Sequence, residues 1–329
     1  MKTKNILIIV ILIIAIAFLF SYNPTTTGRA IKEDTVKIAH LPVTHGLPLY
    51  MAFENGWFEE AGINVEIIKF ESPNQIIDAL LQNNIDFASG AANGIVGIVN
   101  HKNPGKIQII AITGGSLEIP SENFVIPKEK DYKTIQDLKG KKIGILAGTI
   151  QWQTIIKEIL EVNGLSLDDV TIIELAPSIQ VPTLASKQID ALLALEPIST
   201  VTLEKADAKI MIAAPVSKYI SNPFFGGADI VRTKFAKENP ETTKKVVEIF
   251  ERAHKEIREN PEDSKKYLKG HTALDDNTIR KTPILIFRTH NQLSSDDIKA
   301  VQDFYNIFTK HGVVDGKIDF EKILYNPSN

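Results

Sequence analysis

The sequence predicts an α/β fold in which mainly parallel sheets are flanked by helices. The clearest evidence is an apolar strand over Val36–Leu41, followed by a helix from Leu47 to about Gly62 and a second strand over Ile63–Ile68. A helix that links two strands is the unit from which parallel sheets are built. The chain repeats this alternation as far as Ala213, and its 329 residues suffice for two compact domains or one large domain.

The composition excludes several classes of protein. A hydrophobic fraction of 43% and a charged fraction of 23% are typical of a globular protein. A net charge of −3 provides no basic surface for nucleic acid. The chain has no cysteine, so disulfides, thiolate chemistry and cysteine-based metal sites are excluded. The histidines His254, His271, His290 and His311 show no metal-ligand spacing, so we expect no metal or cofactor.

The N-terminus carries the clearest targeting signal. Lys2 and Lys4 precede an unbroken apolar run from Ile6 to Phe20, which suits a signal-peptide core and is short for a membrane span. No small-x-small cleavage site follows, so an uncleaved anchor stays open. We expect residues 1–22 to be a signal or anchor segment and residues 23–35 a linker. The body of the protein would then lie outside the cytoplasm, in the periplasm or on the cell surface, either secreted or anchored.

Loops that follow the strands supply the first candidate binding residues, because in parallel sheets these loops face a crevice where ligands bind. Thr44 and His45 follow the first strand. Ser89, Gly90 and Ala91 follow a short strand that ends at residue 88, and residues this small let a backbone approach a ligand closely. An ordinary turn and tight helix packing explain the same residues equally well.

The second half repeats this arrangement. Gly148 and Thr149 follow a strand over Lys142–Leu146, and Thr149 is a good N-cap for the next helix. The free N–H groups and dipole of that helix end suit an anionic oxygen. Gln151 and Trp152 lie in its first turn, where Trp152 either covers a planar group of the ligand or packs as an ordinary indole.

Two further segments contribute candidates. Glu196 follows a strand over Asp190–Leu195, where its carboxylate can accept a bond from an amine of a ligand or cap the following helix. Phe225 and Gly226 precede a strand over Ala228–Val231 and either wall a cleft or fill the core of a hinge. Beyond this strand the sequence predicts only helices.

An ordered set of short phrases resembles the extracytoplasmic substrate-binding proteins of ABC importers for nitrate, sulfonates, taurine and thiamine-pyrimidine precursors. The matching phrases are Lys37–Pro42, Ala52–Glu66, Ala79–Ala88, Asp137–Gly144, Gln188–Ala191 and Glu196–Pro197. The resemblance implies a two-lobed type II periplasmic-binding-protein fold that closes on a small ligand. Lobe I would comprise residues 36–120 and 224–329, and lobe II residues 121–223.

The resemblance also implies a function. We expect a monomeric solute-binding protein that captures a small polar molecule and delivers it to an ABC permease without catalysis. The expected ligand is either like nitrate, sulfonate or taurine, held at Thr149 and His45, or like a thiamine-pyrimidine precursor, stacked on Trp152 with Glu196 on its amine. No arginine stands in the predicted cleft loops, which weakens the sulfonate case.

Two other classes stay open. One is an enzyme of the same fold, of the pyrimidine-forming or menaquinone-pathway type, with His45 as acid or base. The other is a sensory input domain tethered to the membrane. The complete set of predicted ligand-binding residues is Thr44, His45, Ser89, Gly90, Ala91, Gly148, Thr149, Gln151, Trp152, Glu196, Phe225 and Gly226.

Overall fold

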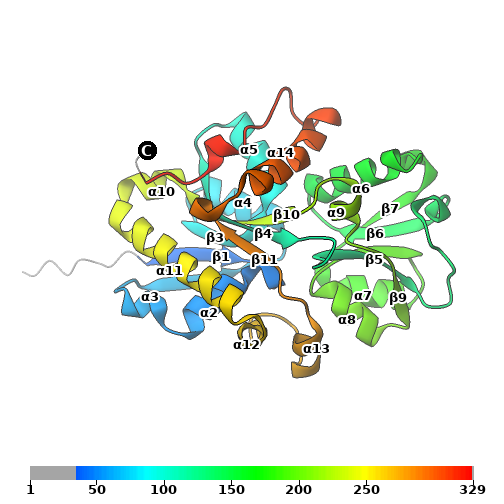
Figure 1. Ribbon diagram of the computed structural model, residues 1–329, viewed down its shortest axis with the longest axis horizontal. Helices are drawn as coiled ribbons and strands as arrows, with labels where there is room; N and C mark the ends of the chain where they lie inside the picture. Colours follow the sequence, from blue (N-terminus) through cyan, green and yellow to red (C-terminus); the bar gives the residue numbers. More distant parts are fainter. Residues whose placement is uncertain (1–34, 328–329) are drawn as a thin grey trace, which may run out of the picture. The chain divides into compact units, whose positions relative to one another are not determined.

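The computed structural model describes residues 35–327, which form two β-sheets flanked by helices (Figure 1). The chain from Thr35 onward is one compact unit. The predicted signal or anchor segment and nearly all of the predicted linker lie outside the described residues. Within residues 35–327, no helix is long and apolar enough to cross a membrane.

The first sheet has six strands in the order β11-β4-β10-β3-β1-β2. β1 pairs in parallel with β2 and β3, whereas β10 pairs antiparallel with both β3 and β4, and β11 pairs antiparallel with β4. The strands span Val36–His40 (β1), Val65–Lys69 (β2), Phe87–Ala92 (β3), Ile107–Gly115 (β4), Phe224–Arg232 (β10) and Ile286–Thr289 (β11).

The second sheet has five strands in the order β7-β6-β8-β5-β9. β6 pairs in parallel with β7 and β8, and β5 pairs antiparallel with β8 and β9. The strands span Glu122–Pro127 (β5), Lys142–Leu146 (β6), Thr171–Leu175 (β7), Ala191–Leu195 (β8) and Ala208–Ala213 (β9).

The predicted two-sheet α/β fold is confirmed, but both sheets are mixed rather than simply parallel. β5 carries the chain from the first sheet into the second, and β10 carries it back. Each of these crossover strands inserts between two strands that run in the opposite direction. The repeated strand–helix pattern predicts the parallel strands and does not reveal these two reversals. The residue boundaries of the two lobes stay a prediction.

The helices surround the sheets (Figure 1). They are α2 (Leu47–Glu54), α3 (Trp57–Glu60), α4 (Pro73–Leu81), α5 (Asn93–Lys102), α6 (Ile150–Val162), α7 (Pro177–Ala185), α8 (Ile198–Lys205), α9 (Pro215–Tyr219), α10 (Thr233–Glu238), α11 (Pro240–Glu259), α12 (Pro261–Ser264), α13 (Asp276–Lys281) and α14 (Ser295–Lys310). Short 3-10 helices span Thr44–Gly46, Ile135–Leu138, Leu167–Asp169, Lys265–Leu268, His290–Gln292 and Glu321–Ile323.

Three local predictions were wrong. The helix expected from Leu47 to about Gly62 is interrupted at Gly56, which has a left-handed φ of 68°. The strands β3 and β10 include the residues predicted as loops around Gly90 and Gly226, because small residues there hide the usual strand signal. The C-terminal region is not all helical, because four residues, Ile286–Thr289, form the edge strand β11, too short to show a period.

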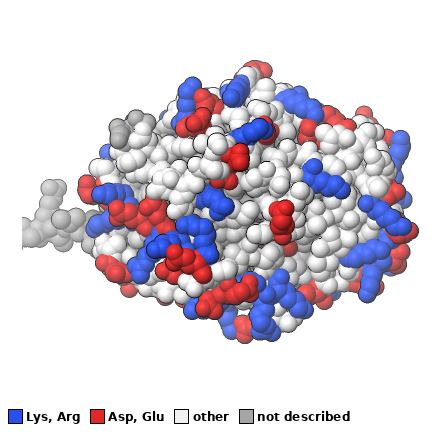
Figure 2. Space-filling model, viewed as in Figure 1, with Lys and Arg blue, Asp and Glu red and all other residues white. Residues whose placement is uncertain are grey.

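The two sheets share one apolar core beside the crossover strand β10. The ring of Phe224 meets Trp152 of α6 edge-on at 6.3 Å and Phe304 of α14 edge-on at 5.1 Å between centroids. All three side chains belong to a core cluster that also contains residues of both sheets. Acidic and basic side chains are interspersed on the face shown in Figure 2, which agrees with the small net charge.

Candidate functional site

A cavity of about 50 Å³ lies between the two sheets. The loop after β1 and the backbone of β3 and β10 form its first wall. The ends of β6 and β8, together with the first turns of α6, α7 and α8, form its second wall. Both walls therefore bring strand ends to one place, as expected for ligand sites in α/β folds.

His45 is held in the first wall between two glycines. A Cβ added at Gly227 would lie 2.4 Å from Cδ2 of His45, and one added at Gly90 would lie 2.9 Å from its Cβ. Real Cβ atoms do not approach this closely, so a larger residue at either position would displace the imidazole. The glycines of β3 and β10 therefore fix the position of His45.

A buried network anchored on Asp229 of β10 sets the shape of this wall. The pairing of β10 with β3 shifts register between Ala228 and Ile230, and Gly90 opposite has a φ of 69°. Oδ1 of Asp229 accepts hydrogen bonds from the hydroxyl of Ser89 at 2.7 Å and from the N–H of Gly90 at 3.0 Å. The hydroxyl of Ser89 is thus engaged within the sheet.

The second oxygen of Asp229 is also paired. Oδ2 lies 2.9 Å from Nε2 of His254, and both side chains are completely buried. A buried carboxylate is costly unless it is paired and hydrogen-bonded, and Asp229 has both kinds of partner. The network therefore holds together β3, β10 and α11 directly behind His45.

His45 is an uncharged and incompletely bonded group. Its side chain is buried, and desolvation lowers its pKa to about 4, although the nearby charge of Asp229 acts in the opposite direction. Nδ1 is buried without a hydrogen-bond partner among the described residues. Leaving such an atom unsatisfied costs about 1–3 kcal/mol, so a ligand that bonds to it would gain affinity.

The second wall reaches across the cavity through Gln151. Thr149 accepts a bond from the N–H of Trp152 at 3.4 Å, which confirms the predicted N-cap of α6. The buried amide of Gln151 accepts from the N–H of Gly94 at 2.7 Å and donates to the carbonyl of Gly226 at 3.2 Å. This side chain therefore joins α6 to β10 and α5 of the first-sheet side.

Trp152 packs as an ordinary indole and also lines the cavity, and its role toward a ligand stays a prediction. It lines the cavity, and it is also buried, with 4% of its surface exposed, against Phe224 in the shared core. An indole fixed in this way presents one apolar surface to the cavity without losing side-chain entropy when a ligand arrives.

Glu196 lies behind the cavity lining and caps a helix. Its Oε2 accepts from the N–H of Thr200 at 3.2 Å and from the hydroxyl of Thr200 at 2.8 Å, at the start of α8. Burial raises the pKa of Glu196 to about 7. The carbonyl of Glu196 accepts a bond from Thr44 at 3.3 Å, which is a second polar contact between the walls. Of the two roles expected for the carboxylate, the geometry favours the cap.

The predicted residues divide into two groups. His45, Gly90, Gln151, Trp152 and Gly226 line the cavity. The remaining candidates lie beside it without lining it, and they are Thr44, Ser89, Ala91, Gly148, Thr149, Glu196 and Phe225.

Sequence reasoning missed most of the apolar lining. The missed residues are Leu41, Pro42, Val43, Glu71, Pro73, Ala92, Leu146, Pro177, Gln180, Leu195, Ile198 and Gly227. Applying the strand-end rule to β7, the strand over residues 171–175, would have found Pro177 and Gln180. The same rule also covers Pro42 and Val43, which precede Thr44 in the loop after β1. The apolar lining residues within strands and helices carry no sequence signal that separates them from core.

The cavity offers two amides, an imidazole, one carboxylate and apolar surface. Its polar lining consists of His45, Gln151, Gln180 and Glu71, and among residues 35–327 no lysine or arginine lines it. Glu71 pairs with Lys69 at 3.2 Å, and both side chains are exposed. An anion in this cavity would meet one carboxylate and an uncharged imidazole, and no cationic partner would offset its desolvation.

Sequence comparison identifies the family. The chain belongs to the NMT1/THI5-like family, because the model of that family matches residues 44–264. A binding protein of Brucella abortus is 32% identical over 216 residues, which cover 65% of this chain. The chain spans 64% of the length of that relative.

Two longer matches differ in function. An aliphatic sulfonates-binding protein of Bacillus subtilis is 25% identical over 85% of this chain and 82% of the relative. A 4-amino-5-hydroxymethyl-2-methylpyrimidine phosphate synthase of Aspergillus parasiticus is 24% identical over 87% of this chain and 84% of the relative. The predicted family resemblance is thereby confirmed, and the family contains an enzyme as well as binding proteins.

A solved structure supports the fold. The periplasmic aliphatic sulphonate binding protein SsuA of Escherichia coli superimposes with a TM-score of 0.70 at 16% identity, covering 89% of this chain and 92% of SsuA. This likeness shows that the two proteins share the two-sheet periplasmic-binding-protein fold.

Proposed function

We propose that this chain is the extracytoplasmic solute-binding component of an ABC importer, which captures a small molecule between its two sheets and delivers it to a membrane permease. The observation that carries the proposal is the cavity formed by strand ends of both sheets, with polar contacts across it at Gln151 and Thr44. The sulfonate-binding relative and the SsuA fold support the transport role.

We further propose that the solute is uncharged and has a planar apolar part, as a thiamine-pyrimidine precursor does. The neutral imidazole of His45 lines the cavity, and once the walls open its buried, unpartnered Nδ1 becomes available for a hydrogen bond to a ring nitrogen or an exocyclic amine. Trp152 and the surrounding aliphatic residues suit the faces of a ring. Nitrate, sulfonate and taurine would each place an anionic group where the lining has no cation.

Capture requires the walls to move. A cavity of about 50 Å³ is smaller than a ring-sized solute needs, since a cavity of about 150 Å³ is the size that holds benzene. The contacts of Gln151 with Gly94 and Gly226, and that of Thr44 with Glu196, must break to admit the solute. Binding energy from contacts to both walls would then favour closure around it.

Binding without catalysis is part of the proposal, although an enzyme of the family is similar to this chain. A general base must titrate near the working pH, whereas burial lowers the pKa of His45 to about 4. The carboxylate nearest to it in the network, Asp229, is bonded to Ser89, Gly90 and His254. These features support a hydrogen-bonding role for His45 rather than proton transfer.

The test is calorimetric titration of the full chain with four probes: 4-amino-5-hydroxymethyl-2-methylpyrimidine, methanesulfonate, taurine and nitrate. We expect one-to-one binding of the pyrimidine alone, its recovery unchanged after incubation, and loss of that binding in His45→Ala. His290→Ala is the control, because His290 lies outside the cavity lining. Tighter binding of an anion overturns the ligand class, and conversion of the pyrimidine overturns the binding role.

A further inference from the structure

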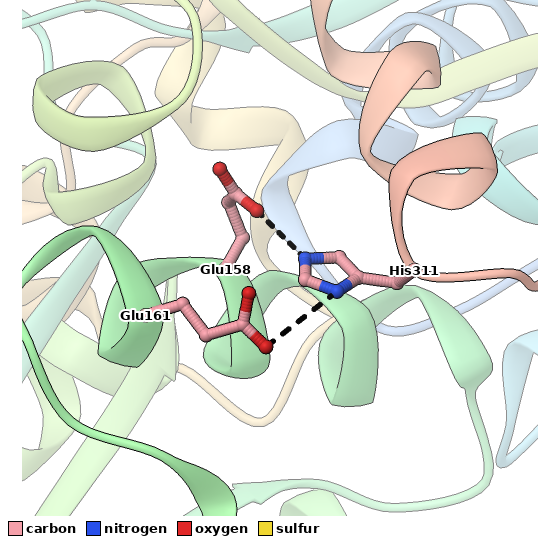
Figure 3. A group of neighbouring side chains, drawn as sticks. All are labelled: Glu158, Glu161 and His311. Atoms are coloured by element: carbon pink, nitrogen blue, oxygen red, sulfur yellow. Dashed lines mark hydrogen bonds and ion pairs between the residues drawn. The ribbon is translucent and has the colours of Figure 1, made fainter.

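Three ionisable side chains outside the cavity converge where α6 meets the C-terminal end of α14 (Figure 3). Nε2 of His311 lies 2.6 Å from Oε2 of Glu158, and Nδ1 lies 3.8 Å from Oε1 of Glu161. One donor atom from each residue can be chosen so that the three lie within 4.8 Å of one another. We propose that Glu158, Glu161 and His311 form a binding site for a divalent metal ion of the zinc type.

The donor set matches such an ion. Zinc binds imidazole nitrogen and carboxylate oxygen, and sites with three protein ligands keep a fourth position for water. Two carboxylates and a neutral imidazole carry two negative charges, which balance one divalent cation. Calcium and magnesium prefer an all-oxygen shell, so the histidine favours zinc over both.

The geometry requires only small movements. Metal–ligand bonds of about 2.1 Å place two tetrahedral ligands about 3.4 Å apart. One nitrogen of His311 and one oxygen of each glutamate lie within 4.8 Å of one another, so the ligand atoms must close by no more than the difference between these two distances. The side chain of Glu161 is 39% exposed and can adjust, whereas those of His311 and Glu158 are 4% and 10% exposed and are held by the surrounding structure.

Lys310 occupies part of this site as an internal competitor. Its ammonium nitrogen lies 2.8 and 2.6 Å from the two oxygens of Glu158. The lysine side chain is 49% exposed, so it can turn outward into solvent when an ion takes its place. Only the lysine side of this pair is exposed, and a metal ion must displace its ammonium group to reach Glu158.

The helix geometry places Glu158 and Glu161 together, and the distance of His311 along the chain explains why sequence spacing does not reveal the site. Glu158 and Glu161 are three residues apart on α6 and therefore lie on one face of that helix. His311 is the C-cap of α14 and is separated from them by some 150 residues. Metal spacing rules search local sequence and cannot bring these segments together. A bound ion would join α6, which follows β6 of the second sheet, to the last long helix of the chain.

The test is titration of the full chain with zinc chloride in a calorimeter at neutral pH, because metal ions compete with protons for the same ligand atoms. We expect one ion per chain, and we expect His311→Ala to weaken binding at least about tenfold. Glu161→Gln is the second variant, because this half-exposed residue can be replaced without disturbing the core. His290→Ala should leave zinc affinity unchanged.

Removing the ammonium group of Lys310 should raise zinc affinity, whereas replacing a metal ligand should lower it. Lys310→Met should tighten zinc binding at least about twofold, because the ion then displaces no ammonium group from Glu158. Lys299→Met is the matched control, because Lys299 pairs with Asp303 on the exposed face of α14. Absence of one-to-one binding, or binding that His311→Ala and Glu161→Gln both leave unchanged, would show that the cluster is only an ion-pair network.

Discussion

The two crossover strands each carry a completely buried acid, and the two acids have different partners. Asp229 of β10 is bonded to Ser89, to Gly90 and to the imidazole of His254. Within residues 35–327, Glu122 of β5 accepts from neutral donors, which include the hydroxyl of Ser121, the N–H of Val216 at 3.1 Å and the backbone of Ser217. The carboxylate of Asp229 therefore shares its network with a second ionisable side chain, whereas that of Glu122 is bonded to neutral groups.

The difference shows where pH sensitivity enters the molecule. Burial raises the pKa of Glu122 to about 7, and the nearby carboxylate of Glu196, whose pKa burial also raises to about 7, acts in the same direction. Asp229 is part of the hydrogen-bonded network that shapes the first wall of the cavity. Glu122 and Glu196 are therefore two buried acids that change protonation near neutral pH.

Replacing Asp229 should have the largest effect on the free energy of unfolding. Asp229→Ala leaves His254, Ser89 and the N–H of Gly90 without their partner, so we expect a loss of about 3–5 kcal/mol in the free energy of unfolding. Urea denaturation measures this loss. The control Asp303→Ala removes only an exposed pair and should cost no more than about 1 kcal/mol. Equal losses of unfolding free energy in the two variants would contradict the role of Asp229 in holding the first wall together.

Glu122 should control how the free energy of unfolding depends on pH. The folded pKa of Glu122 is about 7 and its ordinary value is 4.5, so the folded state binds more protons between these values. Its contribution to stability is therefore complete below about pH 4.5 and is lost as pH rises to about 7, by on the order of 3 kcal/mol. Glu122→Gln should remove this loss in denaturation curves recorded at pH 5 and pH 8. An unchanged pH dependence in the variant rules out Glu122 as its source.

His45 should show the opposite sign. Its folded pKa of about 4 lies below the ordinary 6.5, so the unfolded state binds more protons between these values. This contribution is complete above about pH 6.5 and is lost as pH falls to about 4. His45→Gln should therefore flatten the acid side of the stability profile, which thermal unfolding from pH 4 to pH 7 measures. A variant as acid-sensitive as the parent would mean that His45 is not held neutral.

A smaller effect should come from the glycine that holds His45 in place. The Cβ of Gly227→Ala would lie 2.4 Å from the imidazole, and overpacking of this kind costs about 1–3 kcal/mol. Denaturation should show this cost, and calorimetry should show weaker solute binding because His45 is displaced. Wild-type stability together with wild-type binding would contradict the close contact.

Much of the fold was predictable because hydrophobic patterns and capping residues specify it locally. The parallel units, the N-cap at Thr149 and the long amphipathic helix α11 carry strong local signals. The antiparallel crossovers and β11 depend on pairing between distant segments, which a single sequence does not display. The prediction for β3 and β10 failed because their small residues resemble loops and mark a bulge and a close contact.

The candidate site was predictable only in part, for a related reason. His45, Gln151 and Trp152 lie near strand ends and were found by that rule. Ser89 and Glu196 satisfy the same rule, but their side chains bond to Asp229 and Thr200, which no local pattern reveals. The partner of a polar side chain is a property of the tertiary structure.

The most direct measurement is the mass spectrum of the solute released when the purified full chain is denatured. We expect an uncharged ring compound, present at one per chain and absent from His45→Ala. Release of nitrate, taurine or another sulfonate would contradict the proposal that a cavity lining without a cation selects an uncharged solute.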